Sequence, residues 1–314
     1  MIPLELIREF EMQMKGLRIG STPLRRAPKL EKRFGIRRLH LKLEGQNPSG
    51  THKDRAALIH VLDARKKGKD VITAVSCGNY GASIAYVAEK LNIECRVYIP
   101  RDFAAPRRAE IEAMGAKVVD VDGDYESAMR RAAQEAFQGG WYDANPGGEN
   151  KELGIFAYTY IAKEIAQSLG RQPDWVSVPV GNGTLIGGIW QGFRSMSMKP
   201  RMLGVSNNNS VVHGLAAGMR ESLAVPDIKI TEINEPLSGN FLLDSEEAIS
   251  AIVDSNGAAH EIPDDDLLKA SSVIMQDEGL DVLPAAAGSV WGIDRLDSKN
   301  HVFVAVLTGK GHFE

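Results

Sequence analysis

Short apolar runs alternate with amphipathic segments along most of the chain. The run at 71–75 has no polar alternation and predicts a strand that is buried on both faces. The next segment, 82–91, places Ile84, Val87 and Leu91 on one side of a helix. The same reasoning predicts further strands at 39–43, 95–99, 117–121, 175–180, 201–205 and 301–306. It predicts further helices at 54–66, 106–114, 125–137, 153–169, 185–194, 265–277 and 285–296.

Repetition of strand and helix indicates an α/β fold with an open parallel sheet. We place a smaller domain at residues 37–145, inserted into a larger one formed by residues 1–36 and 146–314. The segment 228–243 fits neither pattern and is interpreted as a mobile loop.

Composition and charge exclude several classes of protein. The chain has 314 residues, a net charge of -4 and 43% hydrophobic residues, which fits a globular protein of one or two domains. The mild acidity argues against nucleic acid as a partner, and no apolar stretch approaches the ~20 residues of a membrane span. The only cysteines, Cys77 and Cys95, lack metal-ligand spacing, so no metal site is expected and the cytoplasm is the simplest location.

Lys53 follows a turn that ends a strand and begins a helix. The segment reads Asn47-Pro48-Ser49-Gly50-Thr51-His52-Lys53-Asp54. A lysine at a helix N-terminus is less readily charged, because the helix dipole opposes a cation there. Such a lysine is a candidate for forming a Schiff base with an aldehyde cofactor. For an isolated lysine a solvated first-turn position is the commoner interpretation, and two further segments shift the balance.

The first of these segments, 76–83, is a turn of small residues between a predicted strand and a predicted helix. Its sequence is Ser76-Cys77-Gly78-Asn79-Tyr80-Gly81-Ala82-Ser83. Such a turn directs backbone N–H groups at a ligand and suits a carboxylate, while the Asn79 side chain could reach a ring hydroxyl. The alternative is an ordinary turn in which Asn and Gly supply unusual backbone angles.

The second segment, Gly181-Asn182-Gly183-Thr184, also joins a buried strand to a helix. Its glycines allow the backbone to approach an oxyanion closely. It lacks the Lys-Ser/Thr ending of a nucleotide-binding P-loop and the GxGxxG spacing of a dinucleotide site, so a small phosphate monoester is expected. The alternative is tight packing of helix on strand without a ligand.

Together the three segments resemble those of the fold type II family of pyridoxal-phosphate enzymes. Two further stretches, 262–289 and 306–311, narrow the resemblance to threonine synthases, and Gly20-Ser21-Thr22-Pro23-Leu24 extends it to the start of the chain. The motifs occur in family order over nearly the whole sequence. The resemblance implies two open, mostly parallel twisted sheets flanked by helices and pyridoxal 5'-phosphate as cofactor. It also implies a small amino acid as substrate, and we expect a homodimer.

The resemblance also implies roles for individual residues. Lys53 would carry the cofactor and later move the α-proton, and the smaller domain would hold both Lys53 and the substrate-carboxylate loop. The larger domain would hold the cofactor-phosphate loop, which comprises Gly181, Asn182, Gly183 and Thr184. Asn79 would contact the ring hydroxyl of the cofactor, and Thr308 its pyridine nitrogen. The residues implied in binding the substrate carboxylate are Ser76, Cys77, Asn79 and Tyr80.

Some positions depart from the threonine synthase pattern. The usual Asn-Ser-x-Asn-Pro is Tyr142-Asp143-Ala144-Asn145-Pro146 here, and Asp143 would repel a substrate phosphate. Lys151 would replace the usual arginine, although a point charge is not a bidentate fork. Tyr80 replaces a customary threonine, and Leu283 a glutamate.

The sequence therefore leaves three functions to distinguish. The first is a threonine synthase-like lyase that converts O-phosphohomoserine and water to threonine and phosphate. The second is elimination or replacement at the β-carbon of serine, threonine or an O-activated serine, as in a dehydratase or a cysteine synthase. The third is a non-catalytic protein that binds small anions and has no use for Lys53.

Overall fold

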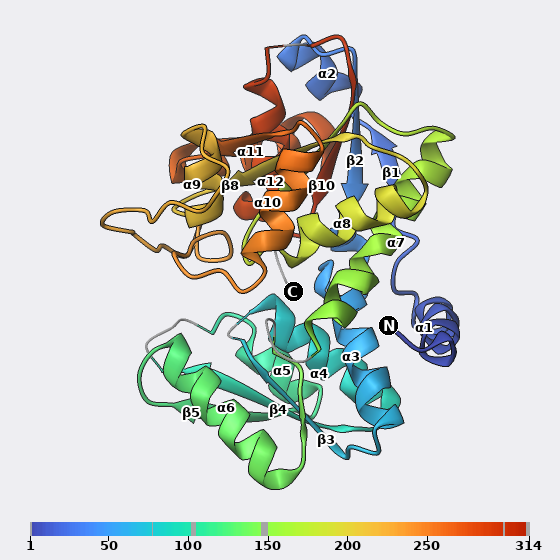
Figure 1. Cartoon of the computed structure of the whole chain (residues 1–314), viewed down its shortest axis with the longest axis vertical. Helices are drawn as coiled ribbons and strands as arrows, with labels where there is room; N and C mark the ends of the chain where they lie inside the picture. Colours follow the sequence, from blue (N-terminus) through green and yellow to red (C-terminus); the bar gives the residue numbers. More distant parts are fainter. Residues whose placement is uncertain (1, 77, 102–104, 146–149, 298, 312–314) are drawn as a thin grey trace. The chain divides into compact units, whose positions relative to one another are not determined.

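The computed structural model describes residues 2–76, 78–101, 105–145, 150–297 and 299–311 (Figure 1). The chain divides into two compact units. The smaller unit contains the residues up to Gly20 together with Asn47–Ala157, and the larger unit contains Ser21–Gln46 together with the residues from Tyr158 onward. The boundary falls inside one helix, α7 (Lys151–Leu169).

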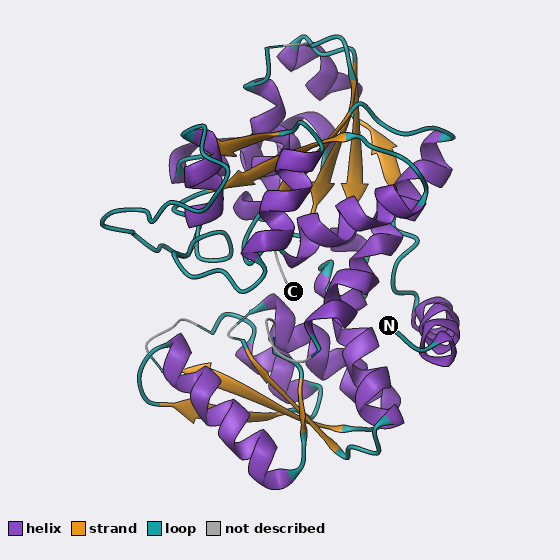
Figure 2. Ribbon diagram, viewed as in Figure 1, coloured by secondary structure: helices purple, strands orange, loops and turns teal. Residues whose placement is uncertain are grey.

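The smaller unit is built on a four-stranded parallel sheet with the order β5-β4-β3-β6. Its strands are β3 (Val71–Val75), β4 (Glu94–Pro100), β5 (Lys117–Val121) and β6 (Tyr142–Asp143). Its helices are α1 (Leu4–Leu17), α3 (Lys53–Lys66), α4 (Asn79–Leu91), α5 (Arg108–Ala113) and α6 (Tyr125–Gly139). Figure 2 shows α6 on one face of the sheet and α3 and α4 on the other. Helices on both faces explain why every residue of β3 is buried.

The larger unit contains a six-stranded sheet with the order β1-β2-β10-β7-β8-β9. The strands are β1 (Leu24–Arg26), β2 (Arg38–Leu43), β7 (Trp175–Pro179), β8 (Arg201–Ser206), β9 (Ala258–Glu261) and β10 (Val302–Leu307). Among these described strands, the edge strand β1 pairs in antiparallel fashion and the rest pair in parallel. The helices are α2 (Pro28–Phe34), α8 (Thr184–Ser195), α9 (Ser210–Ala216), α10 (Ser245–Asp254), α11 (Asp264–Glu278) and α12 (Pro284–Asp294), and a 3₁₀ turn spans Glu44–Gln46. The two sheets confirm the predicted α/β fold.

The predicted elements agree closely with the observed ones where the apolar pattern is strong. The strands at 71–75 and 117–121 match β3 and β5 residue for residue. The pattern missed α1, α2, α9, α10 and the short edge strands. In α10 the buried side chains are Ala248, Ala251 and Ile252, two of which are alanines.

The bounds of the two units differ from the domain bounds that we expected from the sequence. Strand β2 was expected in the smaller domain, but it pairs with β10 and β1 and so belongs to the larger sheet. Helix α1 lies in the smaller unit, where it packs against α3. Both placements depend on partners that are distant in sequence.

The segment 228–243 contains no helix or strand, as expected, but it is anchored to the larger unit. Leu237 is buried, and Asn234 donates hydrogen bonds to the Asp264 carboxylate (2.9 Å) and to the carbonyl of Lys229 (3.2 Å). Gly239 pairs with Asn209 in an isolated bridge. These contacts stabilise an irregular loop by satisfying its polar groups.

A buried polar cluster in the smaller unit gives its stability a pH dependence. Nδ1 of His60 lies 3.3 Å from the Tyr142 hydroxyl, which donates a hydrogen bond to Asp63 (2.8 Å). Burial lowers the pKa of His60 to about 4, because a charged imidazole is poorly solvated there.

We expect the free energy of unfolding to fall on acidification partly through His60. Its ordinary pKa is near ~6.5 in the unfolded chain, so between pH 6.5 and 4 the unfolded state binds more protons than the folded state. Over this window the stability contributed by neutral His60 is lost as the pH falls, by on the order of 3 kcal/mol. Urea unfolding of the wild type and His60→Gln between pH 7 and 4.5 measures the difference in slope. Parallel stability curves for the two proteins would contradict the assignment to His60.

Candidate active site

Lys53 is the first residue of α3, one position before the predicted start of that helix. The turn before it is held by Asp54, which is fully buried and accepts a hydrogen bond from the Ser49 backbone N–H (2.8 Å) and another from the Ser49 hydroxyl. That hydroxyl also lies 3.0 Å from the Ser83 hydroxyl of α4. Burial raises the pKa of Asp54, and the hydrogen bonds from Ser49 oppose that change. The backbone around Lys53 is therefore fixed by its own neighbours.

The structure brings Lys53 close to the turn that follows β3. Nζ of Lys53 lies 5.9 Å from the centre of the Tyr80 ring. Helix α4 begins at Asn79, so the backbone N–H groups of its first turn point out of the end of the helix. Lys53, Ser76, Asn79 and Tyr80 are all half-buried. An amine and a set of backbone donors thus lie at one end of the smaller sheet.

Arg107 is a residue of this site that the sequence did not reveal. Its guanidinium is almost fully buried and donates to Oδ1 of Asn79 (2.9 Å) and to the carbonyl of Ser49 (2.8 Å). It also forms an ion pair with Glu110 (2.6 Å). Because Oδ1 of Asn79 accepts from Arg107, the amide NH₂ of Asn79 is left as the group that donates to a ligand. Arg107 therefore links the lysine turn to the asparagine turn.

The segment that departs from the threonine synthase pattern is tied to the same turn. The Asp143 carboxylate accepts hydrogen bonds from the backbone N–H (3.0 Å) and side chain (2.7 Å) of Asn145. Asn145 in turn accepts from the Val75 N–H (2.7 Å), and the Tyr80 hydroxyl donates to the carbonyl of Ala144 (2.5 Å). Asp143 thus orients Asn145.

Two substrate-binding candidates of the smaller unit remain, Lys151 and Cys77. Lys151 is half-buried at the start of α7. Cys77 lies outside the described residues.

In the larger unit the glycine loop joins β7 to α8. Gly183 precedes the helix with a φ of 102°, a conformation that side chains rarely adopt. A Cβ atom there would lie 2.1 Å from the carbonyl oxygen of Asp244, and one at Gly181 would lie 2.5 Å from that of Pro236. Both positions therefore require glycine.

Two buried polar residues hold the glycine loop in place. The Asp244 N–H donates to the carbonyl of Asn182 (3.0 Å), and its carboxylate accepts from the Thr184 hydroxyl (2.5 Å). Asn209 is fully buried and donates to the carbonyls of Gly181 (3.1 Å) and Leu237 (2.7 Å). The Thr184 hydrogen points to Asp244, so an anion at this loop would be bound mainly by backbone N–H groups.

Thr308 lies at the same edge of the sheet as the glycine loop. It directly follows β10, and β10 pairs in parallel with β7, which the loop follows. Carboxyl ends of neighbouring parallel strands meet at one edge, where ligands of open α/β sheets bind. The larger unit thus holds Thr308 and the glycine loop together, with the loop at a helix N-terminus.

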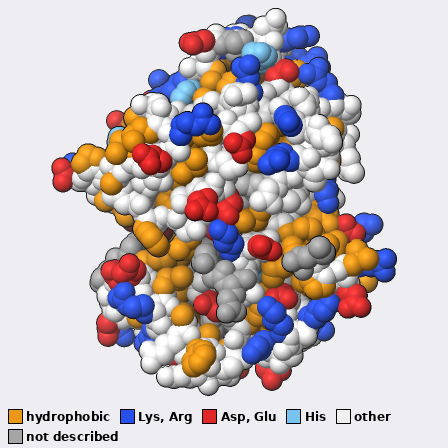
Figure 3. Space-filling model, in the orientation of Figure 1, with side chains coloured by type: hydrophobic (Ala, Val, Ile, Leu, Met, Phe, Trp, Pro, Cys, Tyr) orange, Lys and Arg blue, Asp and Glu red, His pale blue; other side chains and the backbone are white. Residues whose placement is uncertain are grey.

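Other polar features of the described residues have structural roles. Asn207 donates to Asp264 (2.6 Å), and Asn209 caps α9. Within the described ranges no group of three or more His, Cys, Asp or Glu side chains could hold a metal ion. None of the helices searched there is both long and apolar enough to cross a membrane. On the face drawn in Figure 3, basic and acidic side chains are interspersed.

The residues present fit pyridoxal phosphate. The glycine loop offers a dianion the N-terminus of α8 and two positions that admit no side chain. The smaller unit offers the amine of Lys53 and the amide of Asn79, which Arg107 orients.

Comparison with known proteins agrees with this chemistry. Residues 16–309 match the family described as pyridoxal-phosphate dependent enzymes. The threonine synthase of Methanocaldococcus jannaschii is 31% identical, over 96% of this chain and 77% of that protein. The threonine synthase of Halalkalibacterium halodurans is 29% identical, over 93% and 82%.

Solved structures of several enzymes share the fold. The processed form of threonine deaminase isoform 2 from Solanum lycopersicum has a TM-score of 0.80 at 18% identity and covers 99% of this chain and 86% of its own. Maize serine racemase has a TM-score of 0.80 at 19% identity, over 99% and 95%. At these identities the likeness concerns the fold alone.

Proposed function

Because the chain belongs to the family of pyridoxal-phosphate-dependent enzymes, we propose that it is a threonine synthase-like lyase. The reaction converts O-phosphohomoserine and water to threonine and phosphate. The observation that carries the proposal is Lys53 at the first position of α3, with its amine beside the Asn79–Tyr80 turn. The similarity to threonine synthases over 96% of the chain supports the choice of reaction.

The chain's own residues divide the work of binding the cofactor. Pyridoxal phosphate supplies an electron sink that makes the α-proton of an amino acid removable. Backbone N–H groups of Gly181–Thr184 would hold its phosphate, and the Asn79 amide would donate to its ring hydroxyl. The Thr308 hydroxyl would be the partner of the pyridine nitrogen, and a neutral partner would leave that nitrogen unprotonated.

A second set of residues binds and orients the substrate. First-turn N–H groups of α4, at Asn79 and Tyr80, and the Ser76 backbone hold the α-carboxylate at a helix N-terminus. The amine of Lys53 takes the α-proton and returns protons to the reacting carbons. Lys151, at the start of α7, binds the substrate phosphate as a point charge.

A second candidate is elimination or replacement at the β-carbon of serine, threonine or an O-activated serine. The observation that favours it is the segment 142–145. Tyr80 replaces a smaller residue and bonds to Ala144, and Asp143 lies where a phosphate site is expected. Both features suit a shorter substrate without a second phosphate.

A substrate panel distinguishes the candidates. We expect the purified protein to convert O-phosphohomoserine to equal amounts of threonine and phosphate, measured by amino-acid analysis and a phosphate assay. Turnover of serine or O-acetylserine without turnover of O-phosphohomoserine would identify the second candidate instead. A protein that turns over none of them, and whose ligand affinity survives Lys53→Ala, would be the non-catalytic anion binder.

We further propose that the protein is a cytoplasmic homodimer. Cys95 is buried as a free thiol, and burial raises its pKa to about 12, as suits a cysteine that stays reduced. Large apolar side chains such as Phe137 and Phe241 are exposed on the single chain. Sedimentation of the purified protein measures the association, and a monomer at micromolar concentration would exclude the dimer.

A further inference from the structure

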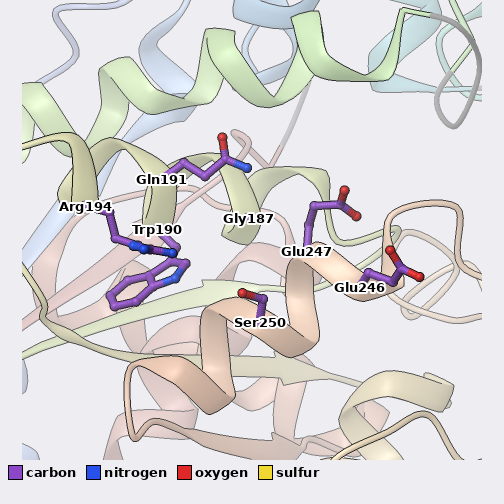
Figure 4. Close-up of a pocket in the computed structure, with 7 residues that line it drawn as sticks. All are labelled: Gly187, Trp190, Gln191, Arg194, Glu246, Glu247 and Ser250. Carbon is purple, nitrogen blue, oxygen red and sulfur yellow. The ribbon is translucent and has the colours of Figure 1, made fainter.

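Helices α8 and α10 of the larger unit line an open pocket that the proposed reaction does not use. Its volume is about 250 Å³, and Figure 4 shows its lining. Besides Gly187, the lining residues are Trp190, Gln191, Arg194, Glu246, Glu247 and Ser250. A space of this volume admits a small molecule such as an amino acid.

Helices α8 and α10 pack closely at Gly187, and the pocket lies beside this contact. A Cβ atom at Gly187 would lie 2.7 Å from Cβ of Glu247, so the helices touch there. One turn further along α8 stands Trp190, whose indole lines the pocket. Glycine at the contact and a large side chain beyond it give the pocket a fixed wall.

The pocket contains a buried donor. Trp190 is 3% exposed, and within the described part of the chain its indole N–H has no hydrogen-bond partner. A buried polar group without a partner costs about 1–3 kcal/mol. In Figure 4 the nitrogen-bearing ring of Trp190 is on the side of Ser250, toward the other lining residues. A ligand that accepts a hydrogen bond from this N–H would recover the cost.

The two ends of the pocket carry opposite charges. Figure 4 shows Arg194 at one end beside Trp190, and Glu246 and Glu247 at the other. A guanidinium at one end favours a carboxylate, and two carboxylates at the other favour an ammonium group. The arrangement complements a molecule with both charges.

We propose that this pocket is an effector site for a small zwitterionic α-amino acid. The guanidinium of Arg194 and the indole N–H of Trp190 bind its carboxylate, and Glu246 and Glu247 bind its ammonium group. The site is separate from Thr308 and the glycine loop, and it goes beyond the proposed reaction.

Both helices of the pocket lead directly to the glycine loop. Helix α8 begins at Thr184, and α10 follows Asp244, whose carboxylate accepts from the Thr184 hydroxyl. A ligand that changes the spacing of the two helices therefore acts on the residues that hold Gly183. By linkage, occupancy of either site alters the affinity of the other.

Tryptophan indole signals test the site in the cofactor-loaded protein. The chain has four tryptophans, and Trp190→Phe assigns the signal of Trp190 in a proton–nitrogen-15 spectrum. L-Valine, which has no leaving group for the proposed reaction, is expected to shift this signal saturably. Isobutylamine and isovalerate lack its carboxylate and its ammonium group respectively, and neither should shift the signal at the same concentration.

A pair of variants separates the pocket from general amino-acid binding. Arg194→Gln is expected to raise the dissociation constant of L-valine about ten-fold, because one charge-assisted hydrogen bond is lost. Arg220→Gln, an exposed arginine of the same unit outside the pocket, should leave it unchanged. An unmoved Trp190 signal, an equal response to isovalerate, or wild-type affinity in Arg194→Gln would each overturn the site. A phosphorus-31 signal of the bound cofactor that stays fixed when valine binds would overturn the coupling.

Discussion

Lys53→Ala is expected to lower turnover of the amino-acid substrate by at least about 10⁴-fold, the upper range for loss of a positioned proton-transfer group. The lysine is assigned two roles, attachment of the cofactor and movement of protons, and the variant loses both at once. The backbone of the turn is held by Asp54 and Arg107, so the variant should fold. Steady-state turnover and the melting temperature measure these two effects separately.

A matched control and a chemical test accompany this prediction. Lys66→Ala removes an amine from the last turn of the same helix, where it pairs with Glu5 on the surface, and should keep full activity. Borohydride treatment of the wild type should fix the cofactor to the peptide that contains Lys53, as read by mass spectrometry. Cofactor fixed to a different peptide, or an active Lys53→Ala protein, would refute the assignment.

Gly183→Asp is expected to weaken cofactor binding by at least about 100-fold. Its Cβ would lie 2.1 Å from a backbone oxygen, so the loop must shift, and its carboxylate would repel the phosphate. Loss of one or two hydrogen bonds to a charged group costs about 3 kcal/mol, which corresponds to this factor. Equilibrium dialysis with pyridoxal phosphate measures the change without reference to activity.

Two alanine variants distinguish the effect of the steric clash at Gly183 from the effect of a side chain at a positive φ. Gly183→Ala keeps the clash without the charge and should still lose cofactor affinity. Gly218→Ala has a similar positive φ of 82° but no atom within 4 Å of the added Cβ, so it should strain the chain and leave cofactor affinity intact. Equal loss in both alanine variants would mean that general destabilisation, and not the glycine loop, explains the result.

The local sequence was sufficient to predict those parts of the candidate site whose conformation is set by neighbouring residues. The turn before Lys53 and the glycine loop before Thr184 could be predicted, because their backbone angles and helix starts are set by the residues themselves. The uniform apolar run of β3 identified a buried strand for the same reason. The asparagine turn followed from its position between that strand and α4.

The partners that support these motifs were not predictable, since they come from distant segments. Arg107 falls at the start of the helix predicted at 106–114, where no motif marks it, yet it is buried against Asn79, 28 positions away. Asp244 contacts Thr184 across 60 positions. The sequence places Asn209 in a polar run typical of a turn, and only the structure shows that it contacts Gly181 and Leu237.

The sequence by itself determined the α/β class, the Schiff-base lysine candidate and the two candidate ligand-binding turns, because each rests on hydrophobic periodicity or on backbone angles over a few residues. Tertiary structure alone decided that β2 joins the larger sheet, that Arg107 orients Asn79, and that α8 and α10 leave a pocket lined by opposite charges. Pairing of strands and burial of polar groups depend on which distant segments come into contact. The sequence pattern of one segment does not indicate which distant segment it will contact.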